Sequence, residues 1–250
     1  MPRTKFRSYI LLAPVIAGFA LLDVACGGSS AEKQVLTNFF RASRVRDNAT
    51  LANIAAVSFD PRTDGSVQSF EVTNVGEEQR RQLQIKQLAS EEEKARQEDA
   101  AFAKKKKEYQ DANIQAIERV VKLERSGGTV KGKDAEVQAA WTKWRDEQSQ
   151  YQKRLSEARA KLANERALAV NSLTAPGRAD VDVSGMDVEL ITKQVTVNAD
   201  VKEPNGTTVP KTIVFTMQRA VGKTADGQTN EGRWIITGIR PQGAAAPSTN

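Results

Sequence analysis

The chain has 250 residues, of which 39% are hydrophobic, 27% are charged and 6% are aromatic, and its formal net charge is +6. The hydrophobic share is low for a globular domain, so we expect a core that does not extend through the whole chain. The sequence contains no histidine and one cysteine, Cys26. This composition excludes Ser-His-Asp triads, Cys-His pairs, histidine-based zinc sites and intramolecular disulfides.

The N-terminus has the layout of an export signal. Residues 1–7 are short and basic, residues 9–22 are an apolar run of signal-peptide length, and small residues follow. The run is too short for a comfortable membrane span. Removing residues 1–25, which carry three basic residues and one acidic residue, lowers the net charge to +4. Nucleic-acid binding calls for a concentrated basic stripe, so no nucleic-acid partner is expected.

Residues 22–30 read Leu-Asp-Val-Ala-Cys-Gly-Gly-Ser-Ser and resemble the processing site of a bacterial lipoprotein. The resemblance implies a lipid, such as palmitate, on Cys26, and residues 26–31 then form a flexible tether. It also implies a location in the bacterial cell envelope, anchored in the membrane and facing the periplasm or the exterior. Asp23 departs from this pattern, which normally has an apolar residue three positions before the cysteine. Ordinary cleavage nearby and an uncleaved membrane anchor therefore remain as alternatives.

The first elements predicted after the tether are two helices and a strand. Apolar residues at helical spacing predict a helix over residues 31–46, in which Val45 extends the pattern. A shorter helix is expected over residues 51–57. Residues 67–75 alternate between apolar and polar side chains, as in a strand with one buried face.

A pair of long helices is predicted next. Residues 77–125 lack proline and glycine and are rich in Glu, Lys, Arg, Gln and Ala, which predicts one continuous helix. A second helix begins near Asp134, whose side chain is expected to cap it, and runs to about residue 170. A short glycine-containing connection makes the two helices antiparallel neighbours, and at ~1.5 Å per residue the hairpin reaches on the order of 55–75 Å.

Both helices carry a seven-residue repeat, which is typical of a coiled coil. The second helix has the fuller repeat, at Val137, Trp141, Trp144, Gln148, Tyr151, Leu155, Ala158, Leu162, Glu165 and Ala169. In the first helix one row is apolar or aromatic, namely Leu88, Ala95, Phe102, Tyr109, Ala116 and Leu123. Its companion row is polar in the middle, at Glu92, Asp99, Lys106 and Asn113.

The remaining chain has the alternation of β structure. We expect strands at residues 179–183, 188–201, 210–221 and 233–239. Residues 203–206, Glu-Pro-Asn-Gly, predict a hairpin turn. Residues 223–232 are predicted as a polar loop, and residues 242–250 as a disordered tail.

This order of elements resembles the nuclear transport factor 2-like (cystatin-like α+β) fold. Two short motifs carry the resemblance: Asp60-Pro61 after the second helix, and Trp234-Ile235-Ile236 in the last strand. The resemblance implies a split α+β domain, residues 32–75 and 167–241, divided by the helical hairpin of residues 76–166. Members of this fold use their cup for catalysis, ligand binding or protein contact, so the fold alone does not give the function.

The candidate contact residues lie on the hairpin. Trp141 and Trp144 are candidate anchors for a protein partner, or they pack against residues 117–123 of the first helix. Lys104, Lys105, Lys106 and Lys107 form a basic run that suits anionic lipid headgroups or an acidic partner, or is a solvated helix face. The polar row of the first helix also indicates a seam that a second copy or another protein could cover. No catalytic residue, metal site or cofactor is predicted.

The sequence therefore predicts an α+β fold, with a small antiparallel sheet and N-terminal helices, interrupted by a long antiparallel coiled-coil helical hairpin. The favoured function is a non-enzymatic, lipid-anchored envelope protein whose hairpin is an interaction or spacer arm. One alternative is a ligand-binding or catalytic cup, which requires an apolar pocket with buried carboxylates between the sheet and the first helix. Another is a periplasmic adaptor of a transport complex, although paired lipoyl-like half-motifs beside the hairpin are missing.

Overall fold

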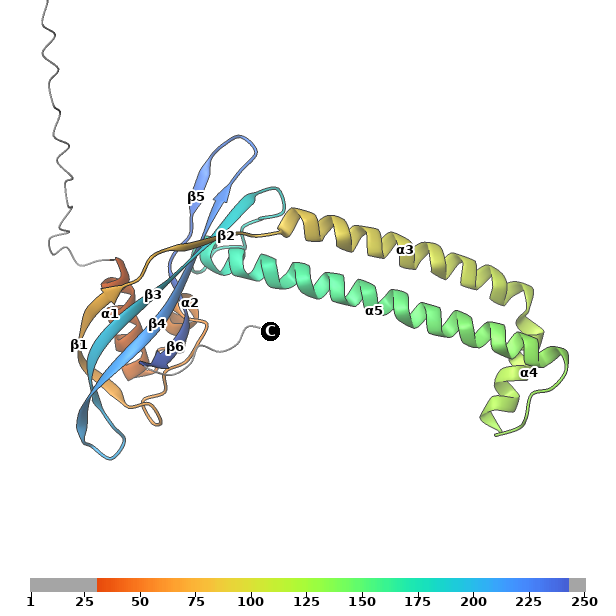
Figure 1. Ribbon diagram of the computed structural model, residues 1–250, viewed down its shortest axis with the longest axis horizontal. Helices are drawn as coiled ribbons and strands as arrows, with labels where there is room; N and C mark the ends of the chain where they lie inside the picture. The colour runs from red at the N-terminus through yellow and green to blue at the C-terminus, as the bar shows by residue number, and fades with distance from the viewer. Residues whose placement is uncertain (1–30, 243–250) are drawn as a thin grey trace, which may run out of the picture.

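The computed structural model describes residues 31–242, which fold into five helices and a curled antiparallel sheet of six strands (Figure 1). The α+β fold class expected from the sequence is confirmed. The helices are α1 (Ala31–Val45), α2 (Asn48–Ile54), α3 (Ile85–Ala112), α4 (Ile114–Arg125) and α5 (Lys133–Leu173). The strands are β1 (Ser66–Val75), β2 (Gln79–Gln82), β3 (Asp187–Lys202), β4 (Thr208–Lys223), β5 (Thr229–Glu231) and β6 (Ile235–Pro241). Cys26 and residues 243–250 lie outside the described residues.

The sheet is built on the long hairpin of β3 and β4. These strands pair without interruption from Asp187 and Lys223 to Lys202 and Thr208, and the predicted turn between them is present, with Gly206 at a φ of +91°. β1 and β2 both lie along the far side of β3, whereas β5 and β6 lie along the far side of β4. The predicted polar loop after β4 therefore contains the short strand β5.

Alternation along β3 divides the sheet into an inner face, covered by α1 and α2, and an outer face. Val195, Val197 and Val201 point inward and are fully buried, as the sequence predicts. They join one hydrophobic cluster with α1 residues such as Leu36 and Phe39. Burying a side chain of this size stabilises the fold by about 1.5–3 kcal/mol, so this cluster is the main core of the sheet domain.

A second hydrophobic cluster joins the long helices to the outer face of the sheet. It contains Val188 and Leu190 of β3, Ile85 of α3, and Leu162 and Ala169 of α5. Beyond this attachment, α3 and α5 run side by side away from the sheet (Figure 1). We refer to residues 85–173 as the helical arm. At ~1.5 Å per residue, the 41 residues of α5 span roughly 60 Å.

The start of the arm differs from the sequence prediction. The helix does not begin at Glu77, because residues Gln79–Gln82 form β2 and pair with Glu189–Thr192 of β3. These four residues are all exposed and polar, so they carry no apolar alternation that would indicate a strand. β2 continues the line of β1 along the same edge of β3, and the helix starts only at Ile85.

The far end of the arm also differs. The predicted continuous helix is broken at Asn113, whose side-chain amide donates to the backbone oxygen of Tyr109 at 2.9 Å. Such local side-chain bonds compete with the helical backbone pattern. α4 leaves the line of α3 there and packs across α5 (Figure 1). Asp134 does not cap α5, since Gly132 occupies the cap position and Asp134 instead forms an ion pair with Arg119.

Three smaller predictions are corrected. The second helix covers residues Asn48–Ile54 rather than 51–57, because Asp47 caps it by accepting a hydrogen bond from the Thr50 amide. Val45 does not extend the buried face of α1, since its side chain is 69% exposed. Residues 179–183 are not a strand, although Val183 is buried against the attachment of the arm.

Candidate functional site

The inner face of the sheet is the place where a cup for a ligand would lie, and side chains fill it. Phe39 and Phe40 of α1 contact Phe215 of β4 edge-on, with ring centroids 6.1 and 5.6 Å apart. Phe59, from the connection after α2, closes the cluster against both α1 rings. All four rings are at most 9% exposed. The apolar pocket required by a ligand-binding cup is therefore occupied by the protein's own core.

One buried ion pair lies at the edge of this core. The Lys193 ammonium group of β3 donates to the Glu32 carboxylate in the first turn of α1, and the two residues are 6% and 8% exposed. Lys193 also lies over the Trp234 ring, 3.8 Å from its centroid. The Arg219 guanidinium approaches the same ring at 4.9 Å and pairs with Glu231. This arrangement fixes the first turn of α1 to the sheet.

Two open hollows of similar size border this core. One, of about 480 Å³, lies where β4 begins and β6 ends, with Asp64, Lys211 and Arg240 on its walls. The other, of about 520 Å³, lies between α1 and β1, with Phe40 and Phe70 on its walls. No group of three or more acidic, histidine or cysteine side chains suited to a metal ion occurs in residues 31–242. Neither hollow has a buried carboxylate on its walls, because the one between α1 and β1 is lined by no acidic residue and Asp64 in the other is exposed.

The seven-residue repeat of α5 forms a covered side of this helix. None of its ten predicted positions is exposed, and Trp141, Leu155 and Leu162 are buried. Their partners include an aromatic stack in which Phe102 of α3 lies between Trp144 and Tyr151, with centroids 5.1 and 4.6 Å away. The two helices thus contact each other through aromatic residues of both predicted rows, whereas Ala169 packs in the cluster at the sheet.

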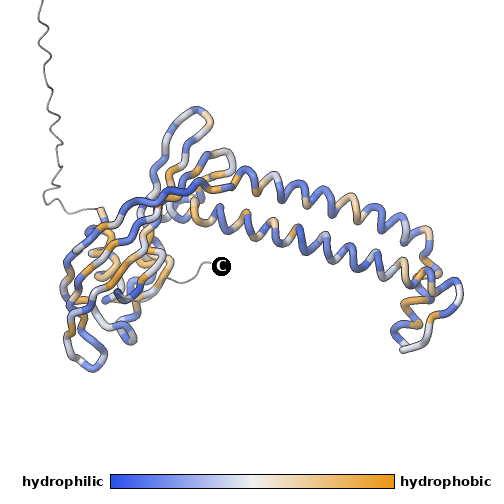
Figure 2. The backbone as a smooth tube through the Cα atoms, viewed as in Figure 1, coloured by the Kyte–Doolittle hydropathy of each residue, from blue (hydrophilic) through white to orange (hydrophobic). Residues whose placement is uncertain are grey.

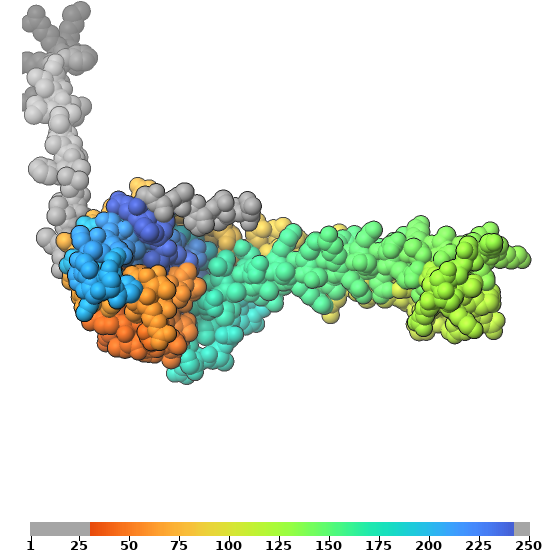
Figure 3. All heavy atoms as spheres, turned by 90° about the horizontal axis from the view of Figure 1, so that it is seen from below, coloured from red at the N-terminus to blue at the C-terminus, as the bar shows by residue number. Residues whose placement is uncertain are grey.

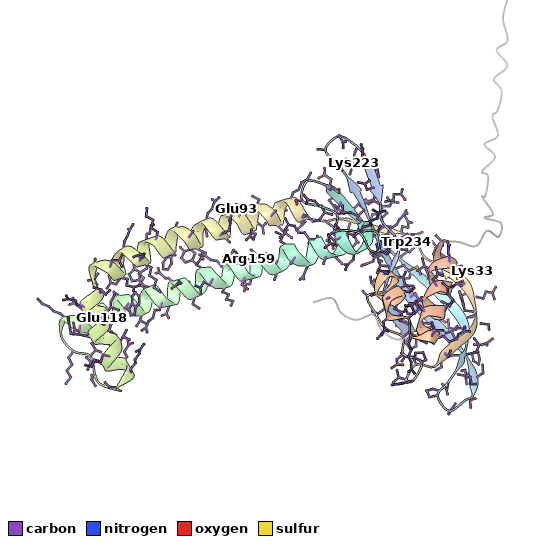
Figure 4. The ribbon with its side chains drawn as sticks, turned by 180° about the vertical axis from the view of Figure 1, so that it is seen from behind. Lys33, Glu93, Glu118, Arg159, Lys223 and Trp234 are labelled. Carbon is purple, nitrogen blue, oxygen red and sulfur yellow. The ribbon has the colours of Figure 1, made fainter. Side chains whose placement is uncertain are left out.

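The polar row of α3 also finds partners within the chain. Glu92 pairs with Arg159 of α5 at 3.2 Å, and Lys106 donates to the Gln148 side chain. Figure 4 shows Arg159 on α5, across from the α3 helix that carries Glu93. Two of the four residues in this polar row, Glu92 and Lys106, therefore have polar partners on α5, whereas the side chain of Asn113 bonds to Tyr109 of α3.

The two candidate tryptophans pack inside the arm. Trp141 is 9% exposed and carries the Lys106 ammonium group 4.9 Å from its ring centroid. Trp144 contacts Phe102 and lies 5.6 Å from the Tyr109 ring. Of the two interpretations of these residues, this geometry favours packing.

The four lysines at residues 104–107 do not share one surface. Lys104, Lys105 and Lys107 are exposed, whereas Lys106 turns toward α5. Burial lowers the pKa of Lys106, and the nearby Arg145 charge lowers it further. Lys107 forms an ion pair with Asp111 at 2.6 Å on the same helix. The run therefore supplies two exposed lysines without an ion pair among the described residues, Lys104 and Lys105.

The end of the arm is a candidate site that the sequence did not single out. We define the tip as residues 114–133, which are α4, its connection to α5 and the first residue of α5. Two of the four most exposed large hydrophobic residues in the described chain lie there, Ile114 at 46% and Leu123 at 36% exposed. Figure 2 shows hydrophobic residues gathering in α4, at the end of an otherwise hydrophilic arm. The inward residues Ile117 and Val120 are buried, so only part of this apolar surface is covered.

The attachment of the arm to the sheet is close and specific. The Ser172 hydroxyl at the end of α5 accepts from the Ala220 amide and donates to the Arg233 oxygen, both at 2.8 Å. The Arg233 amide in turn donates to the Ser172 oxygen at 3.0 Å. A Cβ atom at Gly232 would lie 2.1 Å from the Ser172 hydroxyl oxygen, so only glycine fits there. The glycine before the last strand therefore permits the arm to dock.

No helix in residues 31–242 is both long enough and apolar enough to cross a membrane. The proposed lipid site at Cys26 falls before the first described residue, Ala31. Comparison of the chain with protein-family models, with curated proteins and with solved structures found no match.

Proposed function

We propose that this protein is a non-enzymatic, lipid-anchored component of the bacterial cell envelope, and that its helical arm is an interaction or spacer arm. The observation that carries the proposal is the contrast between the two parts of the structure. The inner face of the sheet is filled by Leu36, Phe39 and Phe215, each 0% exposed, whereas the longest helix of the chain extends away from the sheet. The space-filling view shows the arm projecting from a compact domain (Figure 3).

The anchor and the arm fit this role together. If a lipid is attached at Cys26, four residues lie between it and Ala31, the first residue of α1. The five Cα–Cα steps from Cys26 to Ala31 span at most about 18 Å, so the sheet domain would stay close to the bilayer. The arm would then place its tip roughly 60 Å from its attachment to this domain.

The resemblance to the nuclear transport factor 2-like fold belongs to the same proposal. We interpret the sheet domain as a version of that fold in which the cup is closed and the inserted arm carries the activity. The alternative, a ligand-binding or catalytic cup, would need an apolar pocket with buried carboxylates between α1 and the sheet. The open hollow between α1 and β1 has no acidic residue on its walls, and packed phenylalanine rings fill the core beside it, which supports the arm as the functional part.

The anchor is tested by radiolabelled-palmitate incorporation in a bacterial host that produces the wild type or Cys26→Ala. We expect label and membrane fractionation for the wild type, and neither for the variant. Absence of label from the wild type would contradict the lipid anchor.

The arm is tested by photo-cross-linking in the same cells. A cross-linking residue is placed at Gln110, which is exposed on α3, or at Asn205, which is exposed in the β3–β4 turn. A discrete adduct from Gln110 but not from Asn205 is expected. Adducts from Asn205 alone would place the contact on the sheet domain and contradict the role of the arm.

A further inference from the structure

The tip of the arm combines exposed positive charge with exposed apolar side chains. Residues 114–133 contain five Lys or Arg residues and two Glu residues, a net charge of +3 in 20 residues. This is most of the +4 carried by the whole chain after residue 25. Figure 4 marks Glu118, the one exposed acidic residue of the tip, at this end of the arm.

Most of the tip cations are not used within the protein. Lys122, Arg125, Lys131 and Lys133 are exposed, and none of them forms an ion pair with another residue of the described chain. The fifth, Arg119, forms an ion pair with Asp134. The hydrogen bond from Arg119 holds the pKa of the Asp134 carboxyl group below its usual value. Four positive charges therefore remain available to a partner.

Helix stability does not account for all of these charges. Lys122 and Arg125 lie in the last turn of α4, where cations interact favourably with the helix dipole. Lys133 is the first residue of α5, where the same dipole disfavours a cation, and Lys131 lies just before it. Lys131 and Lys133 thus add positive charge at the start of α5, where it weakens that helix.

One exposed apolar residue lies on the same side of α4 as two of these cations. At 100° per residue, Ile114, Lys122 and Arg125 fall within an arc of about 80° on the outer side of α4. Leu123 lies on the opposite side of the helix from Ile114, next to the buried side formed by Ile117 and Val120. Basic side chains whose apolar stems flank exposed aliphatic residues suit the boundary between anionic headgroups and acyl chains.

We propose that the tip binds the surface of a bilayer that contains anionic phospholipid. This inference rests on the proposed role of the arm and names its partner. The arm then gives the protein a second membrane contact, roughly 60 Å from its attachment to the sheet domain. The binding is mainly electrostatic, with Ile114, on the same side of α4 as Lys122 and Arg125, entering the headgroup region.

Vesicle co-sedimentation tests this contact separately from the lipid anchor. The protein is residues 27–250, the chain without its lipid, which retains both hydrophobic clusters of the fold. The probes are vesicles of phosphatidylcholine alone and vesicles with phosphatidylglycerol at about one third of the lipid. We expect binding to the anionic vesicles only, weakening as salt is raised because exposed charges are screened.

Two matched triple variants locate the contact. Replacing Lys122, Lys131 and Lys133 by Gln is expected to lower the partition coefficient on the order of 100-fold, since each basic residue near an anionic surface contributes severalfold. The control replaces Lys94, Lys153 and Lys161 by Gln, which removes the same charge from exposed positions along the arm. It should bind like the parent chain. Ile114→Asn is expected to weaken binding by up to about tenfold.

Three outcomes would overturn the proposal. Equal losses in both triple variants would show that total charge, and not the tip, governs binding. Equal binding to neutral and anionic vesicles would contradict recognition of anionic lipid. No vesicle binding, together with tip-dependent capture of an acidic protein, would assign the tip to a protein partner. In each case the palmitate experiment still reports independently on the anchor at Cys26.

Discussion

The attachment of the arm depends on the missing side chain of Gly232, which makes Gly232→Ala the most informative substitution in the chain. A Cβ atom there would lie 2.1 Å from the Ser172 hydroxyl oxygen, 2.8 Å from the Ala220 oxygen and 2.9 Å from the Ser172 carbonyl carbon. Rotation of the Ser172 side chain relieves the first contact. The other two involve backbone, so β4 and the end of α5 must separate by about half an ångström.

That separation weakens three hydrogen bonds at the joint. They run from the Ala220 amide to the Ser172 hydroxyl, from that hydroxyl to the Arg233 oxygen, and from the Arg233 amide to the Ser172 oxygen, at 2.8, 2.8 and 3.0 Å. A typical net contribution is about 1 kcal/mol for each bond. We therefore expect Gly232→Ala to lower the free energy of unfolding by about 2–4 kcal/mol.

Urea unfolding followed by circular dichroism measures this loss. Gly185→Ala is the matched control, because an added Cβ there meets no atom within 4 Å, and it should change stability by less than about 1 kcal/mol. Ser172→Ala removes two of the three bonds, and combining it with Gly232→Ala should cost less than the sum of the single changes. A Gly232→Ala protein as stable as the Gly185→Ala control would refute the close docking of α5.

Three other predictions concern single features of the fold. Glu32→Gln leaves the Lys193 ammonium group buried without its carboxylate and should lower the free energy of unfolding by about 3 kcal/mol or more. The double variant Glu32→Leu with Lys193→Met should lie within about 1 kcal/mol of wild type in urea unfolding. Equal losses of stability in the two variants would contradict this account of the ion pair. Asn113→Ala should add about 0.5 kcal/mol of stability, because alanine favours helix more than asparagine does. The break between α3 and α4 should remain, because the burial of Ile117 stabilises the bent arm by more than this gain. A longer maximum dimension of the variant in small-angle scattering would show that the arm had straightened and would contradict the prediction. Hydrogen bonds from Thr50 hold the pKa of Asp47 below its usual 3.8, so the cap stabilises α2 above that pH and is lost as pH falls below it. The melting-temperature difference between wild type and Asp47→Ala should therefore shrink from about pH 6 to about pH 2, and a constant difference would argue against the cap.

The residues of the proposed site were only partly predictable from sequence. The seven-residue repeat of α5 correctly predicted which side chains of that helix are covered, and the structure favours packing for Trp141 and Trp144. The tip was missed because its cations are scattered over a helix and a loop, and because Leu123 fits the apolar row of the repeat. Leu123 is exposed in the structure, in which the helix breaks at Asn113 and α4 leaves the line of α3.

The sequence by itself determined the elements whose signals are local. Alternation of β-branched residues over residues 188–201 and the Glu-Pro-Asn-Gly turn specify the long hairpin, since strand faces and turn conformations depend on neighbouring residues. Composition alone specified long helices in the arm, because Glu, Lys, Arg, Gln and Ala all favour helix.

Only the tertiary structure decided the contacts between distant segments. Gln79–Gln82 is a polar stretch with no strand signal, and it is a strand because the free edge of β3 offers it hydrogen-bond partners. Glu92 and Lys106 of the polar row are paired because α5 brings Arg159 and Gln148 opposite them. Gly232 is required because α5 returns to the sheet 60 residues away in sequence, at Ser172. Local propensity carries no information about such pairings, since their free energy exists only once the chain has brought the two surfaces together.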